Sequence, residues 1–170
     1  MIDVTQAPSL PAARDDRKIV GLIGLAHFNS HVYFLILPPL FAYIRADYGL
    51  SYTQLGAAIS VFNIVSAVLQ TPTGFLVDRV GARNILIAGL LVGAGGVAFA
   101  AALPSYWALV TGFAIAGLAN TVYHPAHYTI LSHRIPARRI GRAFSIHSFF
   151  GMLGSAVAPA SMLLDRKSVV

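Results

Sequence analysis

The sequence contains no cysteine and no glutamate, and it has little charge of either sign. Only 11% of its 170 residues are charged, whereas about 25% is usual in a soluble domain. This leaves too little charge to cover a water-facing surface, and the 56% of hydrophobic residues points to a membrane protein. The missing cysteine excludes disulfides and thiolate metal sites. The missing glutamate excludes a HExxH metalloprotease.

Five apolar stretches are long enough to cross a bilayer as helices. About 20 apolar residues are needed to cross ~30 Å of hydrocarbon, and short polar links separate these stretches. We therefore predict an all-α, polytopic membrane helix bundle, with Pro38 and Pro39 kinking the first span near its outer end. The expected spans are Ile19–Ile44, Tyr52–Val77, Asn84–Leu103, Tyr106–Leu131 and Ala143–Leu164.

The basic residues predict a single orientation. Alternating spans place nine of them on one side of the membrane and only Arg45 on the other, before the final residues. The positive-inside rule then puts the N-terminus in the cytoplasm, in the inner (plasma) membrane. This distribution explains the net charge of +6, so no nucleic-acid partner is expected. The nine residues are Arg14, Arg17, Lys18, Arg79, Arg83, Arg134, Arg138, Arg139 and Arg142.

The expected organisation has three parts. Residues 1–18 form a cytoplasmic tail, of which Met1–Asp16 is expected to be solvated, and residues 19–164 form one transmembrane domain of five helices. Residues 165–170 place Arg166 and Lys167 directly after a span that ends outside, against the orientation rule. This hexapeptide also resembles the translation of a sequencing-library adapter. We predict that it is not native and that the natural protein continues; a genuine short tail is the alternative.

Four of the five spans carry polar or small side chains at helical spacing, whereas the third span is almost purely apolar. Polar groups in hydrocarbon usually face a bundle interior or a cavity. This predicts a wet central cavity, with the third span at the lipid and its Gly89 and Gly93 in close helix contact. Interhelical hydrogen bonding is the alternative, which we favour for Ser and Asn but not for His. The candidate substrate and proton cavity residues are His27, His31, Gln70, Asn120, Tyr123, His124, His127 and His147.

The histidine spacing also raises the question of a membrane metalloenzyme. The pairs His27/His31 and His124/His127 have the spacing of metal ligands, as in membrane di-iron desaturases. However, no carboxylate lies within a span and no third histidine box is present. We therefore expect no enzyme, no metal and no cofactor, and keep the histidine-box enzyme as an alternative of a different class. No P-loop is present, so an ATP-driven pump is not encoded.

The link after the second span reads GFLVDRVGAR over residues 74–83. It resembles the G-x-L-x-D-R-x-G-R-[RK] signature of the major facilitator superfamily, which that family places in this same link; Ala82 departs from the usual basic residue. Physically, Gly81 permits a tight turn, and the charges can cluster at the membrane surface. The resemblance implies a cytoplasmic gate motif, in which Asp78 helps to hold the two halves together. The motif residues are Gly74, Asp78, Arg79, Gly81 and Arg83.

This resemblance implies the first five helices of an expected twelve-helix fold, whose two six-helix halves bind substrate near the membrane midplane. Residues 25–28, 37–40, 120–126 and 141–147 resemble the fosmidomycin-resistance-type branch, which is associated with proton-coupled drug efflux. Phe113 occupies the position where many drug antiporters carry Arg. Protons must therefore use other groups, either the histidines or an acid in the missing half.

The predicted function is that of a secondary active transporter, which moves a small solute by alternating access. We expect proton-coupled efflux of a drug or metabolite. A metabolite uptake symporter of the same fold and a five-span protein that transports nothing remain alternatives. The expected partners are the lipid bilayer, a small-molecule substrate, protons and the missing C-terminal half. Without that half, we expect the 170 residues to transport nothing.

Overall fold

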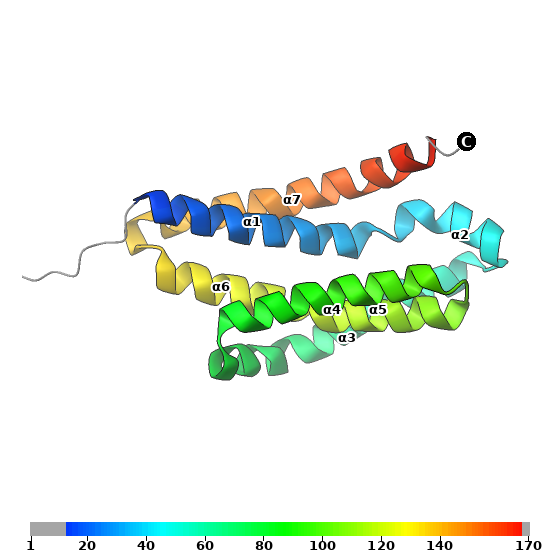
Figure 1. The fold of residues 1–170 in the computed structure, drawn as a ribbon, viewed down its shortest axis with the longest axis horizontal. Coiled ribbons are helices and arrows are strands. Elements are labelled where there is room, and N and C mark those ends of the chain that lie inside the picture. Colours follow the sequence, from blue (N-terminus) through cyan, green and yellow to red (C-terminus); the bar gives the residue numbers. More distant parts are fainter. Residues whose placement is uncertain (1–12, 168–170) are drawn as a thin grey trace, which may run out of the picture.

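The structure is a computed structural model that describes residues 13–167. The described residues are almost entirely helical and contain no strand, so the predicted all-α class is confirmed. Figure 1 shows long helices that run roughly along one axis. The elements are α1 (Ala13–Leu35), the short 3-10 helix η1 (Pro38–Leu40), α2 (Phe41–Tyr48), α3 (Tyr52–Val80), α4 (Ala82–Ala102), α5 (Tyr106–Asn120), α6 (Tyr123–Arg134) and α7 (Ala137–Lys167).

Four of the predicted spans are long and apolar enough to cross a membrane within the described residues. The first is interrupted where the sequence predicts a kink, because Pro38 and Pro39 lack the backbone N–H that a continuous helix needs. α1 therefore ends at Leu35, and the chain continues through η1 into α2. The four membrane-length segments are Asp15–Tyr48, Tyr52–Val80, Ala82–Ala102 and Ala137–Ser161.

The fourth predicted span, Tyr106–Leu131, is not one helix. It is divided into α5 and α6 at Thr121 and Val122, and neither piece qualifies as a membrane span alone. Pro125 has no N–H to donate to the carbonyl of Thr121, so the regular ladder fails there. Instead, the N–H groups of Thr121 and Val122 bond three residues back, to Leu118 and Ala119 oxygens at 3.2 and 3.4 Å.

The links between helices follow the local chemistry of the sequence. Gly81, between α3 and α4, has φ = +97°, and Gly49, after α2, has φ = +66°. Both angles strain any residue with a Cβ atom, so the predicted tight turn at Gly81 is confirmed. Ser51 caps α3 by accepting a hydrogen bond from the N–H of Gln54, and Ser105 caps α5 in the same way.

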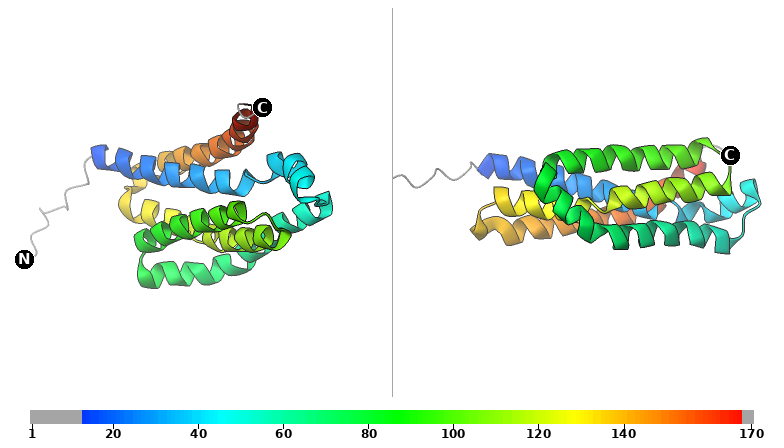
Figure 2. Two further views of the ribbon diagram at one scale, coloured as in Figure 1. Left: turned by 45° about the vertical axis from the view of Figure 1, so that its right-hand side comes forward. Right: turned by 90° about the horizontal axis from the view of Figure 1, so that it is seen from below.

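The helices form two groups that α6 connects. α1 packs along α7, and α5 packs against both α3 and α4, while α6 contacts helices of each group. Figures 1 and 2 show the α3–α4 and α6–α7 links at the same end of the bundle as the start of α1. The α2–α3 and α4–α5 links lie at the opposite end. The segments that carry the nine clustered basic residues are thus at one end.

α4 meets its neighbours through glycine. Gly89 and Gly93, the pair predicted to make a close helix contact, are both buried. A Cβ on Gly89 would collide with the side chain of Val122, and one on Gly93 would lie 3.4 Å from Tyr33. On the other side of this helix Leu91 is 69% exposed, as expected for a helix at the lipid-facing edge.

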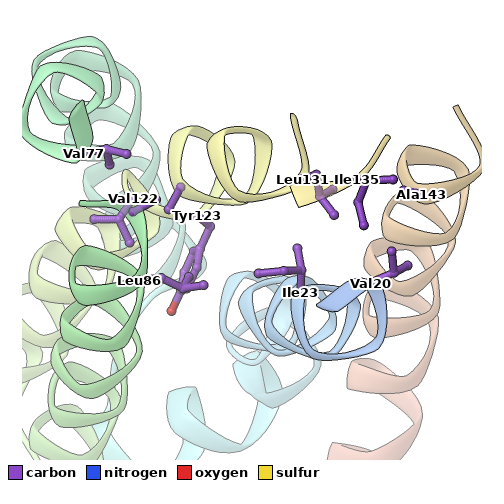
Figure 3. Packing of buried hydrophobic residues seen from close by; sticks show 11 residues of the cluster. Val20, Ile23, Val77, Leu86, Val122, Tyr123, Leu131, Ile135 and Ala143 are labelled. Carbon is purple, nitrogen blue, oxygen red and sulfur yellow. The ribbon is translucent and has the colours of Figure 1, made fainter. Parts of the chain in front are cut away.

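Two hydrophobic clusters hold the bundle together. One lies among α2, α3, α4 and α5 and includes Leu55 and Phe113. The other lies near α6, and Figure 3 shows its side chains filling the space between the two helix groups. In this second cluster Tyr123 and Leu131 of α6 are buried against neighbours from both groups. The broken fourth span therefore supplies the contacts that join the groups.

Candidate functional site

Five histidines from three helices gather where α1, α6 and α7 meet. The ring centroid of His27 lies 5.4 Å from that of His124 and 5.7 Å from that of His127. The sequence places these residues on separate spans, and the structure brings their rings together. We call this set the histidine cluster. It consists of the half-buried His31 and His124 and the buried His27, His127 and His147.

Three hydrogen bonds join α1 and α7 in a chain through the histidine cluster. Ser155 Oγ lies 2.7 Å from His31 Nδ1. His31 Nε2 lies 3.1 Å from His27 Nε2. His27 Nδ1 lies 2.8 Å from the backbone carbonyl oxygen of His147. Each imidazole in this chain uses both ring nitrogens.

The remaining histidines extend the chain toward α6. The rings of His27 and His147 stack with centroids 3.8 Å apart and planes 2° from parallel. His147 Nε2 lies 3.1 Å from His127 Nδ1. His127 Nε2 and His124 Nδ1 are buried without a hydrogen-bond partner among the described residues, which is a costly arrangement for polar atoms. Among the described residues, no group of three or more His, Asp or Glu is placed to hold a metal ion.

Glycine on α7 lets the histidines approach. A Cβ on Gly151 would lie 2.5 Å from Cε1 of His27, and one on Gly154 would collide with the carbonyl oxygen of Phe28. Any larger residue at these positions would push α1 away from α7. Ser155 was not among the predicted cavity residues. It follows His147 and Gly151 in steps of four on one helix face, and this spacing is the signal that could have found it.

A cavity of about 180 Å³ borders the histidine cluster between α1 and the α5–α6 junction. This volume has room for several waters. Ser30 and Phe34 were not predicted as cavity residues. They lie on the same face of α1 as His27 and His31, at steps of three and four. The cavity is lined by Ser30, His31, Phe34, Asn120 and His124.

Five of the eight predicted cavity residues do not line this cavity. His27, His127 and His147 are buried within the histidine cluster. Gln70 is half-buried on α3. Tyr123 is buried with its ring centroid 5.9 Å from that of His127, and its hydroxyl has no hydrogen-bond partner among the described residues. Figure 3 shows the Tyr123 oxygen between α4 and α1.

The predicted role of Ser and Asn residues as interhelical hydrogen-bond partners applies to some positions only. Asn120 Nδ2 donates to Ser66 Oγ at 3.3 Å, and Ser66 Oγ donates to the carbonyl oxygen of Gly117 at 3.0 Å. These bonds join α3 to α5. Ser60 and Asn63 instead donate to carbonyls one turn back in their own helix. These polar side chains of α3 therefore divide into Ser66, which packs against α5, and Ser60 and Asn63, which stay exposed.

The gate motif surrounds the α3–α4 turn. Asp78, Arg79 and Arg83 are exposed, and within residues 13–167 none of them forms an ion pair. Clustering of these charges at the membrane surface therefore stays a prediction. Gly74 is half-buried, and a Cβ there would meet nothing within 4 Å. Only Gly81 has a backbone conformation that demands its residue type.

Asp16 corrects the prediction of a solvated tail over Met1–Asp16. α1 begins at Ala13, before the predicted first span, so Asp16 lies in its first turns and only 6% of the residue is exposed. Arg139 Nη2 lies 2.6 Å from Asp16 Oδ2 and ties α1 to the start of α7. The sequence signal was an acidic residue in the first turn of a helix, where the helix dipole favours it.

The C-terminal hexapeptide, residues 165–170, was predicted not to be native. Its residues 165–167 lie in α7, and residues 168–170 lie outside the described structure.

The sequence profile of the Major Facilitator Superfamily matches residues 23–164, which cover every element of the site. The chain belongs to the major facilitator superfamily. It is therefore a multi-pass membrane protein, and the helix bundle of residues 13–167 is consistent with this family. No solved structure matches the chain.

Curated superfamily relatives carry transporter names. The inner membrane transport protein YajR of Escherichia coli (strain K12) is 38% identical over 84 residues, which are 49% of this chain and 18% of that protein. The uncharacterized MFS-type transporter YfnC of Bacillus subtilis (strain 168) is 29% identical over 83% of this chain and 34% of its own length. The fosmidomycin resistance protein of Escherichia coli (strain K12) is 25% identical over 90% of this chain and 37% of its own length. The chain thus spans 18% to 37% of these relatives.

Proposed function

We propose that this chain belongs to a secondary active transporter, which moves a small solute by alternating access and couples its export to protons. The observation that carries the proposal is the histidine cluster, which is buried between α1, α6 and α7 and opens on a cavity through His31 and His124. The cargo we propose is a drug or small metabolite, since the similar fosmidomycin resistance protein is named for resistance to a drug.

Histidine is the natural proton carrier in this bundle. No Asp or Glu lies between Arg17 and Ile44 in the first membrane-length segment, and none lies in α4, α5 or α6. Imidazole changes charge near neutral pH, and ionisable groups within a membrane are costly enough to be retained chiefly for function. In the proposed cavity Asn120 joins the histidine cluster, and Ser30 and Phe34 complete the lining. No metal or cofactor is needed for this mechanism.

The exposed gate motif fits an incomplete bundle. With the N-terminus in the cytoplasm of the inner membrane, Asp78, Arg79 and Arg83 face the cytoplasmic surface. We propose that the C-terminal half of the same protein supplies their partners in one state of the cycle. It would also cover the cavity face, so the 170 residues alone transport nothing.

The test is solute flux by the complete protein. Inside-out membrane vesicles would be given an inward proton-motive force and radiolabelled fosmidomycin, with a pH-sensitive dye to follow protons. We expect accumulation of fosmidomycin together with proton release from the vesicles. His27→Gln and His31→Gln should abolish both signals. His133→Gln should leave them intact, because His133 is exposed and outside the histidine cluster.

Other outcomes would change the proposal in defined ways. Solute and protons that move in the same direction would indicate an uptake symporter. Flux of fosmidomycin without any proton signal would refute the coupling. Bound iron or zinc in the purified protein, lost with His27→Gln, would instead support the histidine-box enzyme. Measurable flux by residues 1–170 alone would contradict the proposed need for a second half.

A further inference from the structure

The orientation of the hydrogen bonds between α1 and α7 is fixed by one backbone atom. The carbonyl oxygen of His147 can only accept, so His27 Nδ1, at 2.8 Å, must carry a proton. Neutral His27 then has a bare Nε2. His31 Nε2 must donate to it across 3.1 Å. His31 Nδ1 is left bare, and the hydroxyl of Ser155 donates to it across 2.7 Å.

The same heavy atoms also accommodate one additional proton. If His27 is an imidazolium, its Nδ1–H still donates to the carbonyl, and its Nε2–H donates to a bare His31 Nε2. His31 then carries its proton on Nδ1 and donates to Ser155 Oγ, whose hydroxyl rotates to accept. Both states make three hydrogen bonds between the same four residues. Hydrogen bonds to both of its N–H groups lower the cost of burying a charged imidazole.

We infer that Ser155, His31 and His27 form a wire that stores a single proton on His27 and exchanges it with the cavity through His31. This inference rests on the proposed proton coupling and names its site. Loading is a balanced transfer. As the Ser155 hydroxyl turns to accept, a hydronium ion in the cavity gives its proton to His31 Nδ1 and becomes water, the His31 Nε2–H bond breaks, and a His27 Nε2–H bond forms. One proton enters, and one positive charge resides on His27.

Position in the bundle sets the direction of this wire. His31 lines the cavity of about 180 Å³, whereas His27 is 6% exposed and does not line it. Solute in the cavity therefore touches the entrance of the wire and not its end. A solute that displaces the cavity water beside His31 removes the route by which His27 gains or loses its proton. Solute and proton are thus coupled at one residue.

The capacity of the wire is one because the neighbouring groups are also imidazoles. The titratable side chains that face His27 are His31 on α1, His124 and His127 on α6, and His147 on α7. Two like charges this close in a poorly polarisable interior repel strongly. A second proton on His31 would also point two N–H groups at each other between His27 and His31, and that hydrogen bond would be lost.

The test reads tautomers directly, without any flux. The 170-residue chain, labelled with ¹⁵N-histidine and reconstituted in lipid bilayers, would be titrated by solid-state NMR, with His27→Gln and His31→Gln used for assignment. In the neutral state we expect His27 protonated on Nδ1 and His31 on Nε2. On acidification we expect one imidazolium in the histidine cluster, on His27, and transfer of the His31 proton to Nδ1. Exposed His133, outside the histidine cluster, serves as an internal reference for the ¹⁵N signals.

Ser155→Ala separates a wire from a merely packed cluster. It removes the Ser155 hydroxyl from both states, but only the loaded state is left with a buried N–H donor, on neutral His31 Nδ1, that has no acceptor. Formation of the His27 imidazolium should therefore require about a tenfold higher proton concentration, the order of the cost of one unsatisfied buried donor. Ser155→Thr should restore it. Ser145→Ala is the matched control on α7, because Ser145 is exposed and bonds only within its helix.

Three results would overturn the inference. They are a neutral His27 protonated on Nε2, two simultaneous imidazoliums in the histidine cluster, or no effect of Ser155→Ala. If the complete protein couples flux to protons but the observed tautomers of His27 and His31 differ from those expected, this inference alone fails. If the tautomers are correct but no proton-coupled flux occurs, the proposed function fails, and the wire is only a proton-binding site.

Discussion

Gly96 of α4 and Gly112 of α5 face each other at backbone contact. A Cβ on Gly112 would lie 2.5 Å from the carbonyl oxygen of Gly96, and one on Gly96 would lie 2.8 Å from that of Gly112. Gly112→Ala should therefore push the two helices apart and lower the free energy of unfolding by about 1–3 kcal/mol, the usual cost of overpacking. Denaturant-induced unfolding of the chain in detergent micelles would measure this loss.

Gly95→Ala is the matched control for this prediction. Gly95 is adjacent to Gly96 in α4, but it is exposed, and a Cβ there would meet nothing within 4 Å. Alanine is the better helix former by about 1 kcal/mol, so this variant should be as stable as the wild type or more stable. Equal destabilisation by both substitutions would contradict the close α4–α5 contact.

Gly151→Ala should expose the histidine cluster. The new methyl group would meet the ring of His27 at 2.5 Å, so the ring must move from its stack on His147. Modification by diethyl pyrocarbonate, followed by mass spectrometry, would report the change. In the wild type we expect His133 to react first, and in Gly151→Ala we expect His27 to become reactive as well. Gly141→Ala, on an open part of α7, should behave as the wild type.

Thr73 and Thr121 should stabilise the chain as a coupled pair. Their hydroxyl oxygens lie 2.9 Å apart and join α3 to the break between α5 and α6. A double-mutant cycle with Thr73→Val and Thr121→Val isolates their interaction, because valine keeps the side-chain shape. We expect a coupling free energy of about 1 kcal/mol, typical of one intramolecular hydrogen bond. Additive effects of the two substitutions would mean that the contact contributes nothing.

Asp16 and Arg139 should show a strong cost when only one partner is removed. Asp16→Asn leaves the Arg139 side chain, which is 27% exposed, without its counter-ion. We expect a loss of about 1–3 kcal/mol in the free energy of unfolding, below the value for a fully buried pair because Arg139 retains contact with water. Asp16→Asn combined with Arg139→Gln should recover part of that loss. Asp15→Asn, at an exposed position, should have little effect.

Much of the fold could be predicted from the sequence because membrane spans depend on local composition. The second predicted span, Tyr52–Val77, differs from α3 only at its end, and the kink at Pro38 and Pro39 follows from the missing N–H groups. The division of the fourth span follows only in part from this rule. Pro125 lacks the N–H that would bond the carbonyl of Thr121, but the apolar pattern continues across Thr121. Besides the local carbonyl of Leu118, the Thr121 hydroxyl contacts Thr73, which lies 48 positions away.

The candidate site shows the same limit. The spacing of His27 and His31 places them on one helix face, but it gives no indication that His27 bonds to the backbone of a residue 120 positions later. That contact depends on how closely α1 approaches α7, which Gly151 permits. Gln70 shares its helical stripe with Ser66, yet it does not line the cavity, because periodicity gives a face and not a neighbour.

The pairing of α1 with α7 has a consequence for biosynthesis. The principal neighbour of α1, which ends at Leu35, is α7, which begins at Ala137. The polar face of α1 with His27 and His31 therefore has no permanent partner until α7 has been synthesised. Long-range contacts of this kind slow folding, so a nascent chain that stops before α7 would leave these histidines facing lipid or other proteins.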